Sequence, residues 1–230
     1  DLDVISRAPR ELFFDGLGDL LAKIISHLDW RLARLMTDEH YCPVIADASL
    51  GSSRQALAAA RALAADPLAA ARTLTDAVLT SGFCMQALGG SRPAASAEHT
   101  IAHLWEMTEK AGNPRWNLHG VLVGAASRIV LAAYQRLFEI LPAFRPDAPA
   151  RLAAFDREPS WEESLEEGLR PFKSKVAEEM ALRRFSRDTL VDRLARFVQR
   201  REDILAMARP LLDELSEAVQ LLEGLGACLA

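Results

Sequence analysis

Helical periodicity is the feature that most constrains the fold of this chain. In GDLLAKIISHLDWRLARLM, one set of apolar residues recurs every three or four positions: Leu20, Ile24, Leu28, Leu32 and Leu35. This spacing places them on one face of an α-helix. The sequence contains no run of alternating β-branched residues bounded by turns, which is the pattern of a strand. It therefore predicts an all-α domain of roughly eight to eleven helices, with under about a tenth of the residues in strands.

Proline, glycine and aspartate mark the expected helix boundaries. One helix should end at Asp66-Pro67 and the next should begin there, because aspartate caps helices and proline is tolerated in their first turn. Gly89-Gly90 should end that next helix. Further helices are expected through His99 to Met107, from near His119 to Pro142, and as two long helices that meet near Pro210. Gly112 and Pro114 should separate the first two, and Ser160 with Glu163 forms a capping-box pattern.

Composition narrows the class of protein. The chain has 230 residues, of which 50% are hydrophobic and 26% are charged, as expected for a globular domain. Its net charge of −5 argues against nucleic acid as the main partner, because phosphate binding needs a basic surface. No apolar run reaches eighteen residues, so no membrane span is expected. Three cysteines without CxxC spacing indicate reduced thiols and a cytoplasmic location.

The histidines near the middle of the chain are the main candidates for chemistry. His99 and His103 are four residues apart and share a helix face, and His119 lies directly before Gly120, where another backbone could approach closely. Asp19 has apolar neighbours, where a carboxylate is costly unless it is paired or binds a cation. The ordinary alternatives are a chance histidine pair and a carboxylate favoured by the dipole at a helix N-terminus near Asp19. His27 and His40 are expected to be solvated or satisfied in the core.

Three stretches, in order, resemble a known family: GLGDLLAK, GSRPAASAEHTIAHLWEM and LHGVLVG. They resemble the metal-binding helical domain of the iron-containing alcohol dehydrogenase superfamily, and within it most closely the glycerol-1-phosphate dehydrogenases, including the bacterial AraM-like branch. The resemblance covers roughly residues 1 to 145 and implies a multi-helix bundle of the type found in the C-terminal domains of dehydroquinate synthase and glycerol dehydrogenase. Ala95-Ser96 and Val121-Leu122 depart from the family pattern, which affects the expected placement of substrate.

The resemblance also implies roles for individual residues. It assigns Asp19, His99 and His119 as metal ligands and His103 as a catalytic proton relay. Lys23 stands where iron enzymes of the superfamily carry a fourth ligand, a histidine, and a protonated lysine cannot ligate. The implied metal is therefore zinc on three ligands with an open position, with nickel or iron as alternatives. Ser91, Arg92 and Lys23 are candidates for binding a substrate phosphate.

The implied function is the NAD(P)-dependent interconversion of glycerol 1-phosphate, or a related polyol or polyol phosphate, with its ketone. Residues 1–230 form a single helical metal- and substrate-binding domain in this interpretation. The family's N-terminal nucleotide-binding domain is expected to be absent, because no glycine-rich strand-turn-helix segment is present. The residues that bind NAD or NADP are therefore unassigned, and the isolated chain should not turn over substrate. A dehydroquinate-synthase-like lyase and a non-catalytic helical metal-binding or dimerisation module are the alternatives, and a homo-oligomer stays open.

Overall fold

The computed structural model describes residues 1–107, 118–157, 173–183 and 185–226. Within these ranges every regular element is a helix and no strand occurs, which confirms the all-α prediction. The helices in chain order are α1 (Leu2–Ser6), α2 (Arg10–Thr37), α3 (Pro43–Ala62), α4 (Pro67–Leu88), α5 (Ala97–Met107), α6 (His119–Ile140), α7 (Ala148–Phe155), α9 (Lys173–Arg183) and α10 (Arg187–Gly224).

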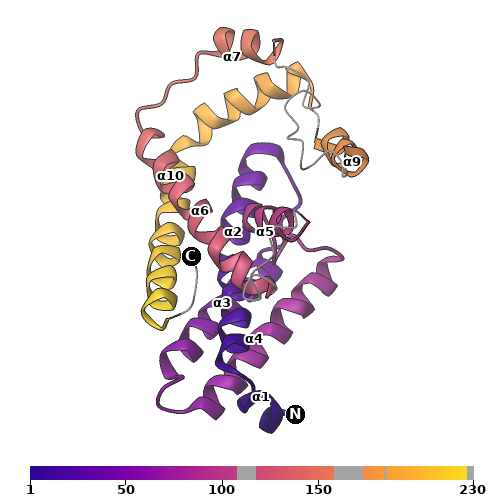
Figure 1. The fold of residues 1–230 in the computed structure, drawn as a ribbon. Helices are drawn as coiled ribbons and strands as arrows, with labels where there is room; N and C mark the ends of the chain where they lie inside the picture. The colour runs from indigo at the N-terminus through magenta and orange to yellow at the C-terminus, as the bar shows by residue number, and fades with distance from the viewer. Residues whose placement is uncertain (108–117, 158–172, 184, 227–230) are drawn as a thin grey trace.

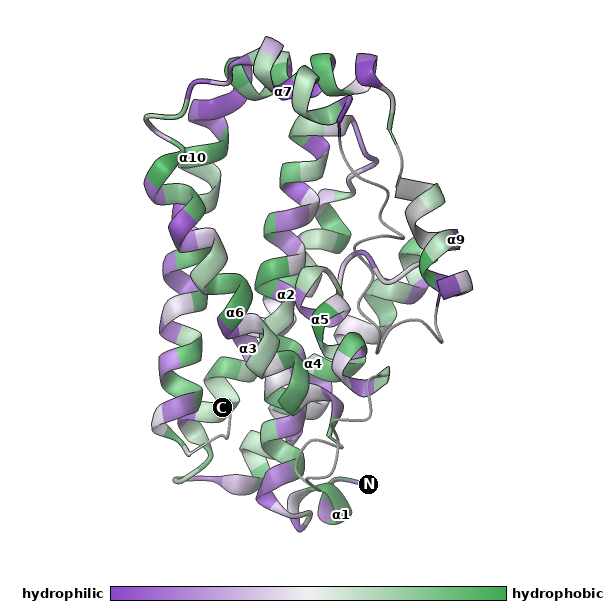
Figure 2. Cartoon of the chain, turned by 45° about the horizontal axis from the view of Figure 1, so that its top comes forward, coloured by the Kyte–Doolittle hydropathy of each residue, from purple (hydrophilic) through white to green (hydrophobic). Residues whose placement is uncertain are grey.

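Helix α2 lies at the centre of the bundle. It contacts α3, α4, α5, α6 and α10, and Figure 1 shows it between the α3–α4 pair and the α6–α10 pair. The predicted apolar stripe explains this position, since Leu20, Ile24 and Leu28 are each at most 1% exposed. Fully burying such a side chain contributes about 1.5–3 kcal/mol, so this face anchors the helix in the core. Figure 2 shows the hydrophilic and hydrophobic bands that alternate along α10, as expected for a helix with one face on the core.

Two helix boundaries agree closely with the sequence prediction. The Asp66 side chain accepts a hydrogen bond from Ala69 N at 2.9 Å, and Pro67 occupies the first turn of α4. Helix α4 ends at Gly89, which adopts a left-handed conformation with φ of 76°. Only glycine enters this region without steric cost, so α4 ends where the sequence predicts.

Two other boundaries were predicted incorrectly. Helix α2 begins at Arg10 rather than near Asp19, so Asp19 lies well inside a helix and the dipole explanation for its carboxylate is wrong. Helix α10 continues through Pro210 instead of dividing there. An internal proline costs about 3 kcal/mol, but Leu211, Leu212 and Leu215 directly after it are buried in the core and offset that cost. The expected break at Gly112 and Pro114 and the Ser160–Glu163 capping box lie outside the described residues.

Helix α6, which carries His119 at its first position, is long and apolar. Among the described helices it is the one long and apolar enough to cross a membrane, with a mean hydropathy of 1.3 in its most apolar window. About 44% of that window is buried inside the domain, and α6 contacts α2, α5 and α10. These contacts are those of a core helix, and length and composition alone are weak evidence for a span.

Candidate active site

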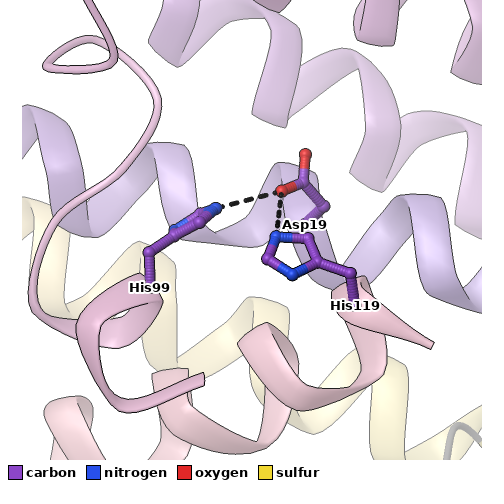
Figure 3. Close-up of side chains that lie close together, drawn as sticks. All are labelled: Asp19, His99 and His119. Atoms are coloured by element: carbon purple, nitrogen blue, oxygen red, sulfur yellow. Dashed lines mark hydrogen bonds and ion pairs between the residues drawn. The ribbon is translucent and has the colours of Figure 1, made fainter. Parts of the chain in front are cut away.

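Three helices bring Asp19, His99 and His119 together. His99 Nε2 lies 3.2 Å from Asp19 Oδ1, and His119 Nε2 lies 3.9 Å from the same oxygen (Figure 3). Asp19 comes from α2, His99 from α5 and His119 from the first position of α6. Eighty residues separate Asp19 from His99, so their meeting is a product of the fold and not of local spacing. One ligand atom from each of the three lies within 4.8 Å of the others.

A close crossing of α2 and α6 places His119. A Cβ added to Gly120 would lie 1.8 Å from the backbone oxygen of Asp15, and one added to Gly18 would lie 2.1 Å from Gly120 O. The helices approach this closely only because both positions are glycine. Asp15 Oδ1 also accepts a hydrogen bond from Val121 N at 3.1 Å, so a side chain of α2 caps the N-terminus of α6.

The segment before α5 is held by buried hydroxyl groups. Ser26 Oγ and Ser49 Oγ both donate to Pro93 O, at 2.9 and 2.6 Å. Ser96 Oγ and Tyr134 Oη donate to the two carboxylate oxygens of Asp29. Burial raises the pKa of Asp29, although both hydrogen bonds act in the opposite direction. Burial and the Asp29 charge raise the pKa of Tyr134 far above its ordinary value. Helices α2, α3 and α6 thus fix the start of α5, and with it His99.

Asp19 is the electrostatic centre of the site. Lys23 is 2% exposed, and its ammonium donates to Asp19 Oδ2 and to Asp19 O, each at 2.9 Å. Burial by itself raises the pKa of Asp19, but the hydrogen bond from His99 and the charge of Lys23 outweigh it and hold that pKa well below its usual range. Burial lowers the pKa of His99, but its hydrogen bonds to Asp19 and Glu98 outweigh burial and raise it.

All seven residues named from the sequence line one cleft of about 1000 Å³: Asp19, Lys23, Ser91, Arg92, His99, His103 and His119. His103 is not part of the Asp19 cluster; its side chain is 56% exposed, and its Nδ1 contacts Glu106 Oε2 at 2.7 Å. The Arg92 guanidinium is held by Glu39 Oε1 at 2.7 Å and by Asp29 O at 3.1 Å. Arg92 therefore ties its loop to α2 and is less available to a phosphate than the sequence suggested.

Asp19, His99 and His119, whose side chains converge, suit a divalent metal ion. Two imidazoles and one carboxylate form a donor set that zinc accepts, and three protein ligands leave a position open for substrate. Lys23 and His99 are hydrogen-bonded to Asp19, whereas Glu98 adds a second, fully buried carboxylate whose Oε2 has no hydrogen-bond partner among the described residues. A divalent cation would compensate this buried negative charge. The role of the three residues as ligands stays a prediction.

Sequence reasoning assigned no role to several residues that shape the site. Glu98 Oε1 accepts from His99 Nδ1, and Glu106 Oε1 accepts from His119 Nδ1. The spacing of three between His103 and Glu106 on one helix face was a signal for the latter. Asp29 and Tyr134 are 105 residues apart, so no local pattern could have paired them.

The remaining histidines have ordinary environments. His27 is 4% exposed, and its Nδ1 donates to Ala46 O at 3.2 Å; burial lowers its pKa. His40 is exposed. Both agree with the expectation that they are satisfied in the core or solvated. Cys42 and Cys84 are free thiols, and Cys228 lies outside the described residues.

The chain is similar in sequence to several proteins that share one name. A protein from Geobacillus thermodenitrificans named glycerol-1-phosphate dehydrogenase (NAD(P)+) is 37% identical over 138 residues, which are 60% of this chain and 34% of the relative. Proteins of the same name from Metallosphaera sedula and Sulfurisphaera tokodaii are 37% and 38% identical over 56% and 58% of the chain, and 36% and 37% of their own lengths. Over more than half of its length, the chain is homologous to glycerol-1-phosphate dehydrogenases. This confirms the resemblance identified from the sequence.

No protein-family model matches the sequence. The chain spans about a third of the length of the curated relatives that it matches. The relatives' names imply NAD(P) and a small-molecule substrate for those proteins.

Proposed function

We propose that this chain is the metal- and substrate-binding part of an NAD(P)-linked glycerol-1-phosphate dehydrogenase. The observation that carries the proposal is the convergence of Asp19, His99 and His119, from three helices, in the cleft that Lys23 and Ser91 also line. Homology to proteins named for this activity supports it. In this proposal a nucleotide-binding domain, which the relatives' greater length accommodates, holds most of the NAD or NADP.

Asp19, His99 and His119 would hold zinc, or alternatively nickel or iron. When bound, the ion supplies Lewis-acid polarisation of the reacting hydroxyl or ketone oxygen. Lys23 keeps Asp19 ionised and oriented through its hydrogen bond to Oδ2, which leaves Oδ1 directed at the two histidines. The open side of the cleft admits the substrate to the same point.

The substrate phosphate would contact Ser91, with smaller contributions from Lys23 and Arg92, because Asp19 and Glu39 already hold their cationic groups. His103 would take up the substrate hydroxyl proton at Nε2, because Glu106 already accepts a hydrogen bond from Nδ1. The exposed edge of this ring lets the proton pass on to solvent. The relatives' names favour a dehydrogenase over the dehydroquinate-synthase-like lyase. A cytoplasmic location suits this activity.

Turnover assays test the proposal. We expect the 230-residue chain to reduce no NAD+ or NADP+ with glycerol 1-phosphate, and a polypeptide in which a nucleotide-binding domain of the family precedes it to do so in a chelator-sensitive way. sn-Glycerol 3-phosphate and a dehydroquinate synthase substrate serve as controls. Activity of the chain alone would contradict the assignment of NAD(P) to another domain. A metal-replete longer polypeptide that acts on neither phosphate would favour the non-catalytic module.

A further inference from the structure

The two histidines that face Asp19 share an arrangement that their role as ligands does not require. In each ring Nε2 faces Asp19 Oδ1, and in each ring Nδ1 contacts a carboxylate: Glu98 Oε1 at 2.8 Å for His99, and Glu106 Oε1 at 2.7 Å for His119. An ionised carboxylate only accepts hydrogen bonds, so both Nδ1 atoms must carry the proton. His99 Nε2 also donates a hydrogen bond, to Asp19 Oδ1. A metal ion bound there would replace that proton, and with Nδ1–H held by Glu98 the Nε2 lone pair would face the ion.

We propose that Glu98 and Glu106 are positioning residues that hold His99 and His119 in the tautomer and orientation required to bind a metal ion through Nε2. This inference rests on the metal site of the proposed function. It adds two residues that touch neither the ion nor the substrate and act only through the histidines. Carboxylates in this position also increase the basicity of the imidazole that they orient.

Glu98 is costly to the fold unless it serves such a role. Its side chain is 0% exposed, and Oε1 also accepts from Ser96 N at 2.9 Å, which fixes the carboxylate against the start of α5. Its Oε2 has no partner in the described structure. A buried oxygen without a hydrogen-bond partner destabilises the fold, and more so when it carries a charge. A leucine of similar volume would pack without this cost, so packing alone does not explain a glutamate here.

Glu106 contacts both a proposed metal ligand, His119, and the proposed proton relay, His103. Its Oε1 contacts His119 Nδ1 and its Oε2 contacts His103 Nδ1, each at 2.7 Å. The same carboxylate therefore orients a proposed ligand and the proposed proton relay. It also steadies His119 at the first position of α6, where the preceding residue provides no side-chain cap.

The cluster of His103, Glu106 and His119 could also hold a metal ion by distance alone. The same ring of His119 would then have to give Nδ1 to one ion and Nε2 to the other. A neutral imidazole has a single lone pair, so both sites cannot be filled at once by neutral rings. The hydrogen-bonded arrangement is therefore preferred, and the binding stoichiometry distinguishes the two.

The test measures zinc affinity of the 230-residue chain by competition with a chromogenic chelator. We expect Glu98→Leu and Glu106→Ala each to weaken binding by about 10- to 100-fold. Glu98→Gln and Glu106→Gln keep an acceptor oxygen and should recover part of this loss. Glu139→Gln is the matched control, because Glu139 is an exposed carboxylate of α6 that pairs with Arg136; it should leave the affinity unchanged. The wild-type chain should bind one zinc ion.

A spectroscopic readout separates positioning from general stability. In ¹⁵N-edited NMR spectra of the zinc-bound chain, the Nδ1–H signals of His99 and His119 should be shifted downfield and protected from water, and Glu98→Leu should remove this signature for His99 alone. If Glu98→Leu does not fold, Glu98→Gln decides, with a smaller downfield shift and weaker binding expected. Unchanged affinity and an unchanged signal in the variants, or two zinc ions per wild-type chain, would overturn the inference. Wild-type protein that binds no zinc would instead overturn the proposed function.

Discussion

At the scale of single residues, the cleft depends on side chains that would each be unfavourable alone. Lys23 is a buried ammonium, Asp19 a partly buried carboxylate and Glu98 a fully buried one. Lys23 and Asp19 satisfy one another one turn apart on α2, and Glu98 Oε1 accepts from its chain neighbours Ser96 N and His99 Nδ1. Removing one partner therefore leaves a buried charge uncompensated, which costs more than the pair contributes. Substitutions here should affect folding as well as binding.

His99 and His103 should respond differently to truncation. His99→Ala removes a proposed ligand, so the purified chain should lose its zinc after dialysis, as measured by elemental analysis. His103→Ala should keep a full equivalent of zinc, because the ring lies outside the Asp19 cluster. In the polypeptide with a nucleotide-binding domain, His103→Ala should slow turnover by about 10²- to 10⁴-fold, the usual contribution of a general acid–base group. Loss of zinc from His103→Ala would contradict these roles.

Asp29 should make stability depend on pH. Burial raises its folded-state pKa, so between the ordinary aspartate value and that raised value the folded protein binds more protons than the unfolded chain. The free energy of unfolding therefore falls as pH rises through this window. Asp29→Asn cannot ionise, so its stability relative to the wild type should improve from pH 4 to pH 7. Urea unfolding of both proteins checks this; a relative stability that declines with pH would show that Asp29 is not destabilised by burial.

At the scale of helices, the crossing of α2 and α6 determines where His119 lies. Gly18 and Gly120 let the two backbones meet, and Asp15 caps α6 from across the crossing. Helix α6 also supplies Tyr134, which fixes Asp29 and through it Ser96 at the start of α5. The three helices that carry Asp19, His99 and His119 are thus aligned by contacts on both sides of the cleft.

Gly120→Ala tests this crossing. The new Cβ would meet the Asp15 backbone, which cannot give way as a flexible side chain would, so we expect a loss of about 1–3 kcal/mol in stability and weaker zinc binding. Gly82→Ala on α4 is the matched control. No atom lies within 4 Å of its added Cβ, and it should stabilise the protein by about 0.5–1 kcal/mol. Thermal unfolding and zinc titration measure both effects, and equal behaviour of the two variants would contradict the close crossing.

The sequence predicted features that depend on neighbouring residues and missed features that depend on contacts between residues far apart in the chain. Local signals located α4 from its aspartate cap to its terminal glycine, and they predicted that Gly120 allows a close backbone approach. Proline and glycine failed to mark helix boundaries where burial of apolar residues in the core favoured a continuous helix. Pro210 did not end α10, and Gly16 and Gly18 did not delay the start of α2, because both stretches gain from packing in the core. The network of Asp29, Ser96 and Tyr134 joins residues that are distant in sequence and left no local pattern.

At the scale of the whole molecule, the Asp19 cluster joins helices from the first and middle parts of the chain, so a bound ion should stabilise the entire bundle. At a free zinc concentration 100-fold above Kd, binding adds about 2.7 kcal/mol. For a domain of this size that corresponds to a rise in Tm of about 5–10 °C. Differential scanning fluorimetry should show the rise, EDTA should reverse it, and His99→Ala should lack it. An equal rise in the variant would indicate that zinc binds elsewhere.

We propose that Asp19, His99 and His119 together hold one divalent metal ion. X-ray absorption at the zinc edge of the purified, zinc-bound chain tests it most directly. We expect two imidazole rings and a carboxylate oxygen at about 2.0–2.2 Å from the zinc, with the remaining position taken by water, and one imidazole fewer in His119→Ala. Sulfur ligands at about 2.3 Å, or a spectrum that His119→Ala leaves unchanged, would contradict it.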